Sequence, residues 1–298
     1  MMKPIAPVVD VALCVALCLL LSPSKVDAQS AALLNISSRA RVNTSDNLGE
    51  ILIGGFIIEA PPGVTKRVLL RAIGPSLGER GVPGALADTV LAVYDQGTSI
   101  ASNNNWRDAQ AAAIEATMIP PTDDLESAVL LELAAGEYTA QVYGTVDTLF
   151  FPGDPRGEGI ALVEIYDLDP ASSARLANIS TRAPVGLGDD VLIGGFIVGG
   201  GTETVLVRAI GPSLALGGAP SPLADPVLEM HNASGDVIGF NDDWKDDQQA
   251  EIEATTIAPT DDREAAILAA LPSGNYTAIL RGSADTTGAA LVEVYDLD

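Results

Sequence analysis

Short runs of alternating hydrophobic and polar residues are the main pattern of this chain. Residues 90–94 (VLAVY) alternate in strand fashion, and a Gln-Gly turn then leads into a second short run. This arrangement is typical of a β-hairpin. Residues 137–144 also alternate with period two, residues 160–167 are predicted as the last strand of this half, and residues 110–116 form its one stretch with some helical character. The pattern therefore predicts short antiparallel strands with very little helix.

The runs occur twice in the same order. The block VLLRAIGPSL at residues 68–77 returns as VLVRAIGPSL at residues 205–214, and ILIGGF at residues 51–56 returns as VLIGGF at residues 191–196. A block that recurs within one chain indicates a duplicated structural unit. We therefore expect two versions of one domain.

Each copy contains about eight predicted strands, separated by turn residues at regular intervals. Helices do not alternate with these strands, which disfavours a parallel α/β fold. We predict an all-β protein of two tandem antiparallel β-sandwich domains, jelly-roll-like in topology, over residues 33–169 and 175–298.

The N-terminal residues have the composition of a signal peptide. Lys3 supplies a positive charge, residues 11–21 form an apolar run too short to span a bilayer, and Val26 and Ala28 are small residues before an expected cleavage site. We predict a signal peptide over residues 1–28 and a protein that is secreted or held at the cell surface.

Both cysteines, Cys14 and Cys18, lie within the predicted signal peptide. The mature chain is therefore expected to contain no cysteine. This excludes cysteine nucleophiles and zinc-thiolate sites, and it leaves the hydrophobic cores to stabilise the fold without disulfides.

The chain is strongly acidic. It holds 16 Lys and Arg against 40 Asp and Glu, which gives a formal net charge of −24. Such a field repels nucleic acid and anionic lipid. No apolar run after residue 28 is long enough for a membrane helix. We predict no nucleic-acid partner and no membrane span in the mature chain.

Residues suited to catalysis are few. His231 is the only histidine, and Tyr94 stands at its place in the first copy. No histidine-based triad or general base is therefore duplicated. With so many acidic residues, some carboxylate pair is expected by chance and does not indicate a glycosidase. We predict that the protein is not an enzyme.

Two arginines, Arg71 and Arg208, lie in the middle of apolar strands. A buried guanidinium without a partner is strongly unfavourable, so each arginine needs a carboxylate or several carbonyl groups nearby. We predict structural ion pairs, for which the acidic residues Asp88, Asp225, Glu164 and Glu293 are available.

Asn and Asp side chains gather in the loops of both copies, more densely in the second. Such oxygen ligands suit a hard cation such as Ca2+. The same side chains also cap turns and helix starts without any metal, so both alternatives stay open. The candidate calcium ligands are Asn241, Asp242, Asp243, Asp246, Asp261 and Asp262.

The only tryptophans, Trp106 and Trp244, stand at equivalent loop positions. A flat exposed indole can hold a sugar ring, whereas a single tryptophan in each domain more often covers the edge of a core. Both roles are considered, and Trp106 and Trp244 are the candidate ligand-binding residues.

The blocks LIGGF, RAIGPSL, GNYTA and ALVEVYDLD resemble repeat domains of secreted bacterial proteins without assigned activity. This resemblance covers nearly all of the predicted mature chain. The stretch from PVLEMHNASGDVIGFNDDW to LPSGNYTAILRG is loosely similar to bacterial pre-peptidase C-terminal domains, which are jelly-roll sandwiches appended to secreted enzymes. The resemblances imply an accessory or surface module, sometimes matrix-binding and calcium-assisted.

These patterns together predict a secreted, non-catalytic surface, matrix or adhesion protein that binds extracellular proteins or glycans through its loops. One alternative is a carbohydrate-binding module that uses Trp106 and Trp244. Another is a structural subunit of an extracellular polymer, in which exposed strand edges pair between molecules by self-association.

Overall fold

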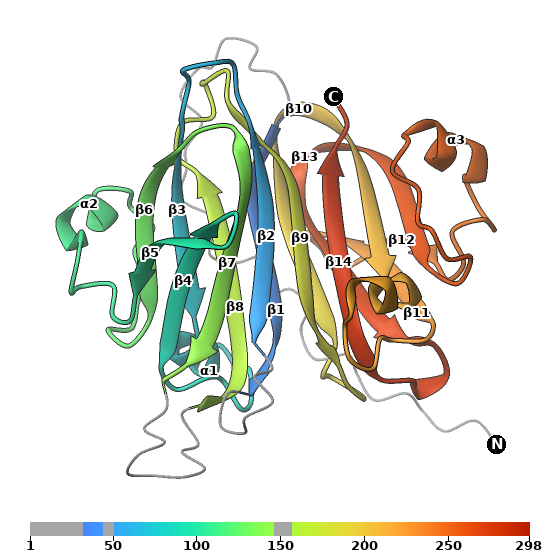
Figure 1. The fold of residues 1–298 in the computed structure, drawn as a ribbon, viewed down its shortest axis with the longest axis horizontal. Helices are drawn as coiled ribbons and strands as arrows, with labels where there is room; N and C mark the ends of the chain where they lie inside the picture. Colours follow the sequence, from blue (N-terminus) through green and yellow to red (C-terminus); the bar gives the residue numbers. More distant parts are fainter. Residues whose placement is uncertain (1–31, 44–50, 146–156) are drawn as a thin grey trace.

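The computed structural model describes residues 32–43, 51–145 and 157–298. The predicted signal peptide lies outside the described residues, as do most of the two insertions that distinguish the first copy from the second. Within the described residues the protein is mostly β, so the predicted all-β class is confirmed (Figure 1). No helix in these ranges has the length and apolar character needed to cross a bilayer.

The first copy contributes eight strands to the described structure, which fall where alternation predicts them. They are β1 (Ala32–Asn43), β2 (Leu52–Glu59), β3 (Lys66–Ile73), β4 (Thr89–Asp95), β5 (Thr98–Asn103), β6 (Ser127–Leu133), β7 (Gly136–Gly144) and β8 (Glu158–Asp167). Two short helices interrupt them, namely α1 (Pro75–Glu79) and α2 (Ala111–Glu115).

The second copy repeats this order with fewer, longer strands. They are β9 (Arg175–Val185), β10 (Leu192–Ile210), β11 (Pro226–Asn232), β12 (Val237–Asn241), β13 (Ala265–Gly282) and β14 (Gly288–Asp296). The helical segments are η3 (Pro212–Gly217), α3 (Gln249–Ala254) and η4 (Ser283–Asp285).

Strands β10 and β13 each run through two strands that the sequence predicts separately. The pairing between them continues from Leu192 to Ala209 with a register shift between Val198 and Thr202. In the first copy, Pro61 and Pro62 separate β2 from β3, and proline has no N–H to donate to a ladder. The corresponding bend of β10 consists of glycines, so its hydrogen bonding resumes almost at once.

The strand orders of the two copies are equivalent. In the first copy, β1-β8-β3-β6 form one set of neighbours and β5-β4-β7-β2 another. In the second copy, β9 and β14 are followed by the C-terminal half of β10 and the N-terminal half of β13. The N-terminal half of β10 pairs with the C-terminal half of β13. That half of β13 also pairs with β11, and β11 pairs with β12. All of these ladders are antiparallel.

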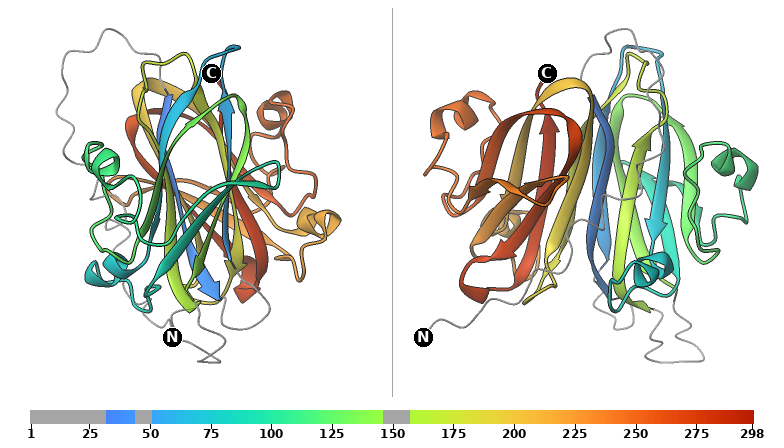
Figure 2. Two further views of the ribbon diagram at one scale, coloured as in Figure 1. Left: turned by 60° about the vertical axis from the view of Figure 1, so that its left-hand side comes forward. Right: turned by 180° about the vertical axis from the view of Figure 1, so that it is seen from behind.

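The sheet passes from one copy to the other at two junctions. Strand β2 pairs with β9, and β1 pairs with the N-terminal half of β10. The main hydrophobic cluster consequently includes side chains of both copies, and the strands curl around it into a near-barrel (Figure 2). The two copies are therefore joined by main-chain hydrogen bonds and by a shared core.

The second glycine of each LIGGF block explains how closely the junction strands pack. Gly55 lies opposite Ser180, and Gly195 lies opposite Ser37. A Cβ atom at either glycine would stand 2.6 Å from the hydroxyl oxygen of that serine. The duplicated glycine thus leaves room for the serine hydroxyl at the contact between the copies, and a larger residue there would force that hydroxyl to turn away.

Candidate functional site

The RAIGPSL turns are held by buried glutamates. Glu126, which has no exposed surface, accepts hydrogen bonds at Oε1 from the backbone N–H of Gly74 (3.2 Å) and from the N–H (3.0 Å) and hydroxyl (2.6 Å) of Ser76. Its Oε2 accepts the N–H of Asp123. Glu264 binds the equivalent groups of Gly211 and Ser213. These motif residues thus support the fold.

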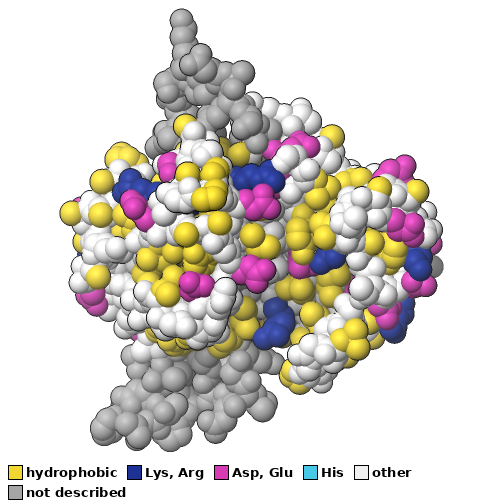
Figure 3. All heavy atoms as spheres, turned by 45° about the horizontal axis from the view of Figure 1, so that its top comes forward, with side chains coloured by type: hydrophobic (Ala, Val, Ile, Leu, Met, Phe, Trp, Pro, Cys, Tyr) yellow, Lys and Arg dark blue, Asp and Glu magenta, His cyan; other side chains and the backbone are white. Residues whose placement is uncertain are grey.

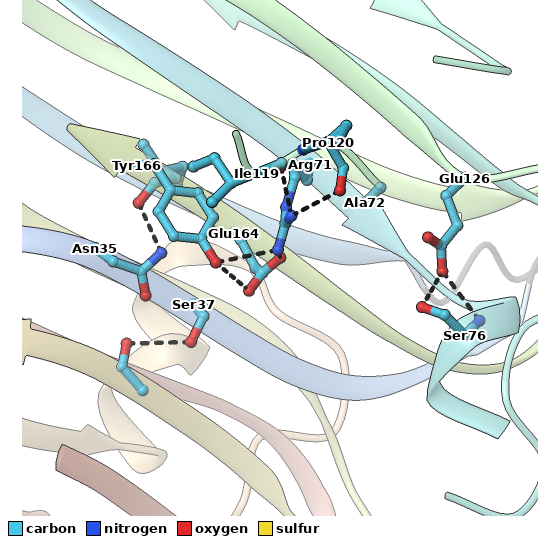
Figure 4. A network of polar contacts seen from close by, with 12 residues as sticks. Asn35, Ser37, Arg71, Ala72, Ser76, Ile119, Pro120, Glu126, Glu164 and Tyr166 are labelled. Atoms are coloured by element: carbon cyan, nitrogen blue, oxygen red, sulfur yellow. Dashed lines mark hydrogen bonds and ion pairs between the residues drawn. The ribbon is translucent and has the colours of Figure 1, made fainter. Parts of the chain in front are cut away.

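Arg71 lies on the outer side of the sheet in a closed polar network (Figure 4). Its Nε donates to Glu164 Oε2 (2.9 Å), and its Nη1 donates to the carbonyl oxygen of Ile119 (2.6 Å). The hydroxyl of Tyr166 donates to Glu164 Oε1 (2.8 Å). Burial alone lowers the pKa of Arg71, but Glu164 and Tyr166 outweigh it and the net pKa is raised. The guanidinium therefore remains charged and fastens the α2 loop to β3.

The second copy repeats this network. Arg208 donates from Nε to Glu293 (2.9 Å) and contacts the hydroxyl of Tyr295 (3.1 Å). Each of the two arginines for which an ion pair was predicted therefore pairs with the glutamate on the last strand of its copy. The side-chain partners of the arginines do not include Asp88 or Asp225, whose backbone carbonyls accept hydrogen bonds at nearby turns.

Both tryptophans are buried, with exposed fractions of 1% for Trp106 and 5% for Trp244. Each indole packs in a small hydrophobic cluster on the outer side of the sheet, and its N–H donates to the carbonyl of Asp123 or Asp261. An indole in this position has no free face for a sugar ring. Of the two roles considered from the sequence, the burial of the indoles fits a cover over the edge of the core and not an exposed sugar platform.

Side-chain amides cover the outer edge of β6 and of the N-terminal half of β13. Gln248 donates to the carbonyl of Leu268 (2.9 Å) and accepts its N–H (3.1 Å), as a neighbouring strand would. Asn241 accepts the N–H of Ala266. Gln110 and Asn103 make the same contacts with Leu130 and Ala128. These amides satisfy main-chain groups that are otherwise free to pair with another molecule.

The candidate calcium ligands do not converge on one point. Asp261 is paired with Arg263 (2.9 Å), Asp262 with Lys245 (2.5 Å), and the amide of Asn241 is used by the backbone. Among the described residues, no three or more His, Cys, Asp or Glu side chains are arranged to hold a metal ion. The turn-capping alternative fits these contacts better than calcium binding.

Part of this loop is nevertheless unusually acidic. Burial and the neighbouring carboxylates of Asp225 and Asp246 raise the pKa of Asp242 and of Asp243. We refer to Asp242, Asp243 and Asp246, which directly follow β12, as the acidic loop. Their mutual repulsion would be relieved by a positive group from outside.

Exposed apolar side chains are concentrated on β12. Val237, Ile238 and Phe240 are 58%, 42% and 59% exposed. This strand pairs with β11 alone, so its other edge is open in the part of the chain that the structure describes. The equivalent strand β5 has the sequence TSIASN and a single large exposed apolar residue, Ile100. The open apolar edge thus belongs to the second copy.

A groove of about 180 Å³ lies between β12 and the edge of β13. Ile238, Phe240, Ile267 and Leu268 line it, together with Gln248 and Asp247. Its volume is below the roughly 300–1,000 Å³ of ordinary ligand pockets. It therefore suits side chains of a bound segment better than a cofactor. A second hollow, beside Glu164 and Tyr166 at the β1–β10 junction, has about 40 Å³, which is room for only a few water molecules.

No known family model matches this chain, and a search of curated proteins finds no relative.

The amino-acid pattern of residues 237–241 is only a weak signal for the β12 site. The β11–β12 ladder has a register shift that skips Ile238, so two-residue alternation alone does not predict which faces Val237 and Ile238 take. The amides Gln110 and Gln248 carried no signal, because covering a strand edge depends on a partner 20 residues away.

Proposed function

We propose that the protein is an exported, non-catalytic adhesion-type protein that binds an extended segment of another protein along the free edge of β12. The observation that carries this proposal is the cluster of Val237, Ile238 and Phe240 on a strand edge that has no partner among the described residues. An extended peptide can add to such an edge, where main-chain hydrogen bonds give affinity and side-chain contacts give specificity.

Charge favours a partner with basic side chains. The acidic loop stands at the end of β12, and the whole chain has a formal net charge of −24. Two copies of this chain would repel each other, whereas a segment with Lys or Arg beside its apolar residues would neutralise Asp242 and Asp243. The partner we propose is therefore an extended apolar segment flanked by basic residues.

We further propose that each copy is a jelly-roll sandwich. The two four-strand sets of the first copy, β1-β8-β3-β6 and β5-β4-β7-β2, support this, because they place sequentially distant strands side by side as two Greek keys do. The same order in the second copy supports it as well. The shared core and the two junctions favour a rigid pair that presents β12 at one end of the molecule.

Two other functions have less support. A carbohydrate module that uses Trp106 and Trp244 lacks exposed indoles. A polymer formed by edge pairing must overcome the repulsion between acidic chains, and side-chain amides already cover the β6 and β13 edges.

The test is to select a random peptide library on the full chain without its signal peptide. Enriched peptides should alternate apolar residues and carry Lys or Arg. Their affinity should fall at least about tenfold in Phe240→Ser, because this change removes one apolar side chain from the contact. A tenfold fall corresponds to a loss of about 1.4 kcal/mol in binding free energy. The matched control is Ile100→Ser on β5, which should leave binding unchanged.

Three outcomes would contradict the proposal. They are enrichment of no peptide, enrichment of peptides that bind Phe240→Ser as tightly as the unaltered protein, and oligomers in analytical ultracentrifugation that Phe240→Ser converts to monomer. The last would place a second copy of the chain on β12.

A further inference from the structure

Lys66 and Glu203 occupy equivalent positions in the two copies but carry opposite charges. They precede the matching blocks RVLLRAIG and TVLVRAIG. Lys66 is buried, and its Nζ lies 2.8 Å from Asp167 Oδ2 and 3.3 Å from Asp169 Oδ1. In the first copy, the ammonium group of Lys66 therefore lies between two carboxylates, that of Asp167 at the end of the last strand and that of Asp169 just after it.

In the second copy the same space holds a third carboxyl group. Glu203 is 0% exposed, and within the described parts of the chain neither of its side-chain oxygens has a hydrogen-bond partner; Asp296 Oδ2 is also buried without one there. Asp296 and Asp298 are the counterparts of Asp167 and Asp169 in the repeated YDLD block. A buried, unpartnered carboxylate beside two others is strongly unfavourable.

Among the residues that the structure describes, the cation that reaches this cluster comes from β9. Arg175 donates from Nη1 to Asp296 Oδ1 (3.2 Å) and from Nη2 to Glu59 Oε2 on β2 (2.9 Å). From the chain end, Asp298 accepts the N–H of Thr204 (3.1 Å). From β13, the residue opposite Glu203 is Leu271, which carries no charge. Arg175 thus faces more carboxylates than it can neutralise.

The net charges of the two equivalent clusters show what would make the second as weakly charged as the first. Lys66, Asp167 and Asp169 sum to 1 − 2 = −1. Arg175, Glu203, Asp296 and Asp298 sum to 1 − 3 = −2 when all are ionised, and Glu59, the other partner of Arg175, makes the sum 1 − 4 = −3; one proton on a carboxyl group makes either sum less negative by one. A proton on Glu203 would also donate a hydrogen bond to an orphan oxygen of Asp296.

We propose that Glu203 keeps a proton at neutral pH and shares it with Asp296, so that β10 and β14 of the second copy are fastened by a contact that opens in alkaline solution. The contact involves the strand β10 and the C-terminal end of β14, which lie near the top of Figure 1, the side that is turned forward in Figure 3.

The direction of the pH dependence follows from the pKa. Burial, followed by the neighbouring Asp296 and Asp298, raises the pKa of Glu203 from 4.5 to about 8. Below pH 4.5 the folded and unfolded chains both hold the proton. Between pH 4.5 and 8 only the folded chain keeps it, so the contribution of this group to stability falls as the pH rises and levels off above about 8.

The test uses the full chain without its signal peptide. The 13C resonance of the Glu203 carboxyl group, assigned by its absence in Glu203→Gln, should titrate near pH 8. The Tm of the unaltered protein should fall by several degrees between pH 6 and 9. Glu203→Gln should flatten this fall, and Glu203→Lys should raise the Tm at pH 9 by restoring the ion pairs of the first copy.

Lys66→Gln is the matched control. It should lower the Tm at every pH without removing the dependence between pH 6 and 9. A Glu203 resonance that titrates below pH 6, or a Glu203→Gln protein with the unaltered pH dependence, would overturn the proposal. Stabilisation of the unaltered protein by Ca2+ that is lost in Glu203→Gln would also overturn it, because the cluster would then hold a cation in place of the proton.

Discussion

Arg71 on β3 lies directly opposite Glu164 on β8 in the antiparallel ladder, and their side chains pair on the outer side of the sheet. The pair is closed by Tyr166 and by the carbonyls of Ile119 and Pro120. One ladder position thus connects two strands of the sheet with the loop that carries α2.

Removing one partner of this pair should be far more harmful than removing both. Arg71→Met leaves Glu164 buried without its cation and should lower the free energy of unfolding by about 3–5 kcal/mol. The double variant Arg71→Met/Glu164→Leu should recover much of this loss, since no charge remains buried. Denaturant unfolding measures both effects.

Arg67→Met, which alters an exposed arginine on the same strand, is the control and should change stability by less than about 0.5 kcal/mol. A loss as small in Arg71→Met would show that the buried network does not stabilise the fold.

Glu126→Gln should weaken the RAIGPSL turn. The carboxylate accepts hydrogen bonds at both oxygens, and in the amide one of these atoms becomes a donor that faces the N–H of Asp123 or of Ser76. We expect a loss of about 1–3 kcal/mol in urea unfolding. Glu132→Gln, on the exposed side of β6, should have no measurable effect, and equal losses in the two variants would refute this role of Glu126.

Calcium should not change the melting temperature. Asp261 and Asp262 are already paired with Arg263 and Lys245, and a ligand that binds only the folded state would have to raise the Tm. Scanning calorimetry in millimolar CaCl2 and in chelator should give the same midpoint. A higher midpoint in calcium that disappears in Asp261→Asn/Asp262→Asn would instead support the calcium site considered from the sequence.

For most candidate site residues, the sequence could narrow the role or partner only to two or more alternatives. Burial of a charged residue on an apolar strand requires a partner, which is why the need for a carboxylate near Arg71 was predictable. Arg71 pairs with Glu164 and not with Asp88 because the β3–β8 register places Glu164 opposite it. Trp106 is buried because the α2 loop folds back over the sheet. Neither relationship is local in the chain.

By itself, the sequence determined the β class, the duplication and the positions of most strands, because two-residue alternation and turn residues act over a few neighbouring positions. The division into two separate domains stays a prediction. Only the tertiary structure decided that β2 pairs with β9 and β1 with β10, that β12 keeps an apolar edge open among the described strands, and that Glu203 is enclosed with Asp296. Which strand edges stay open and which charges become enclosed depends on which distant strands pair with each other. No single stretch of residues contains that information.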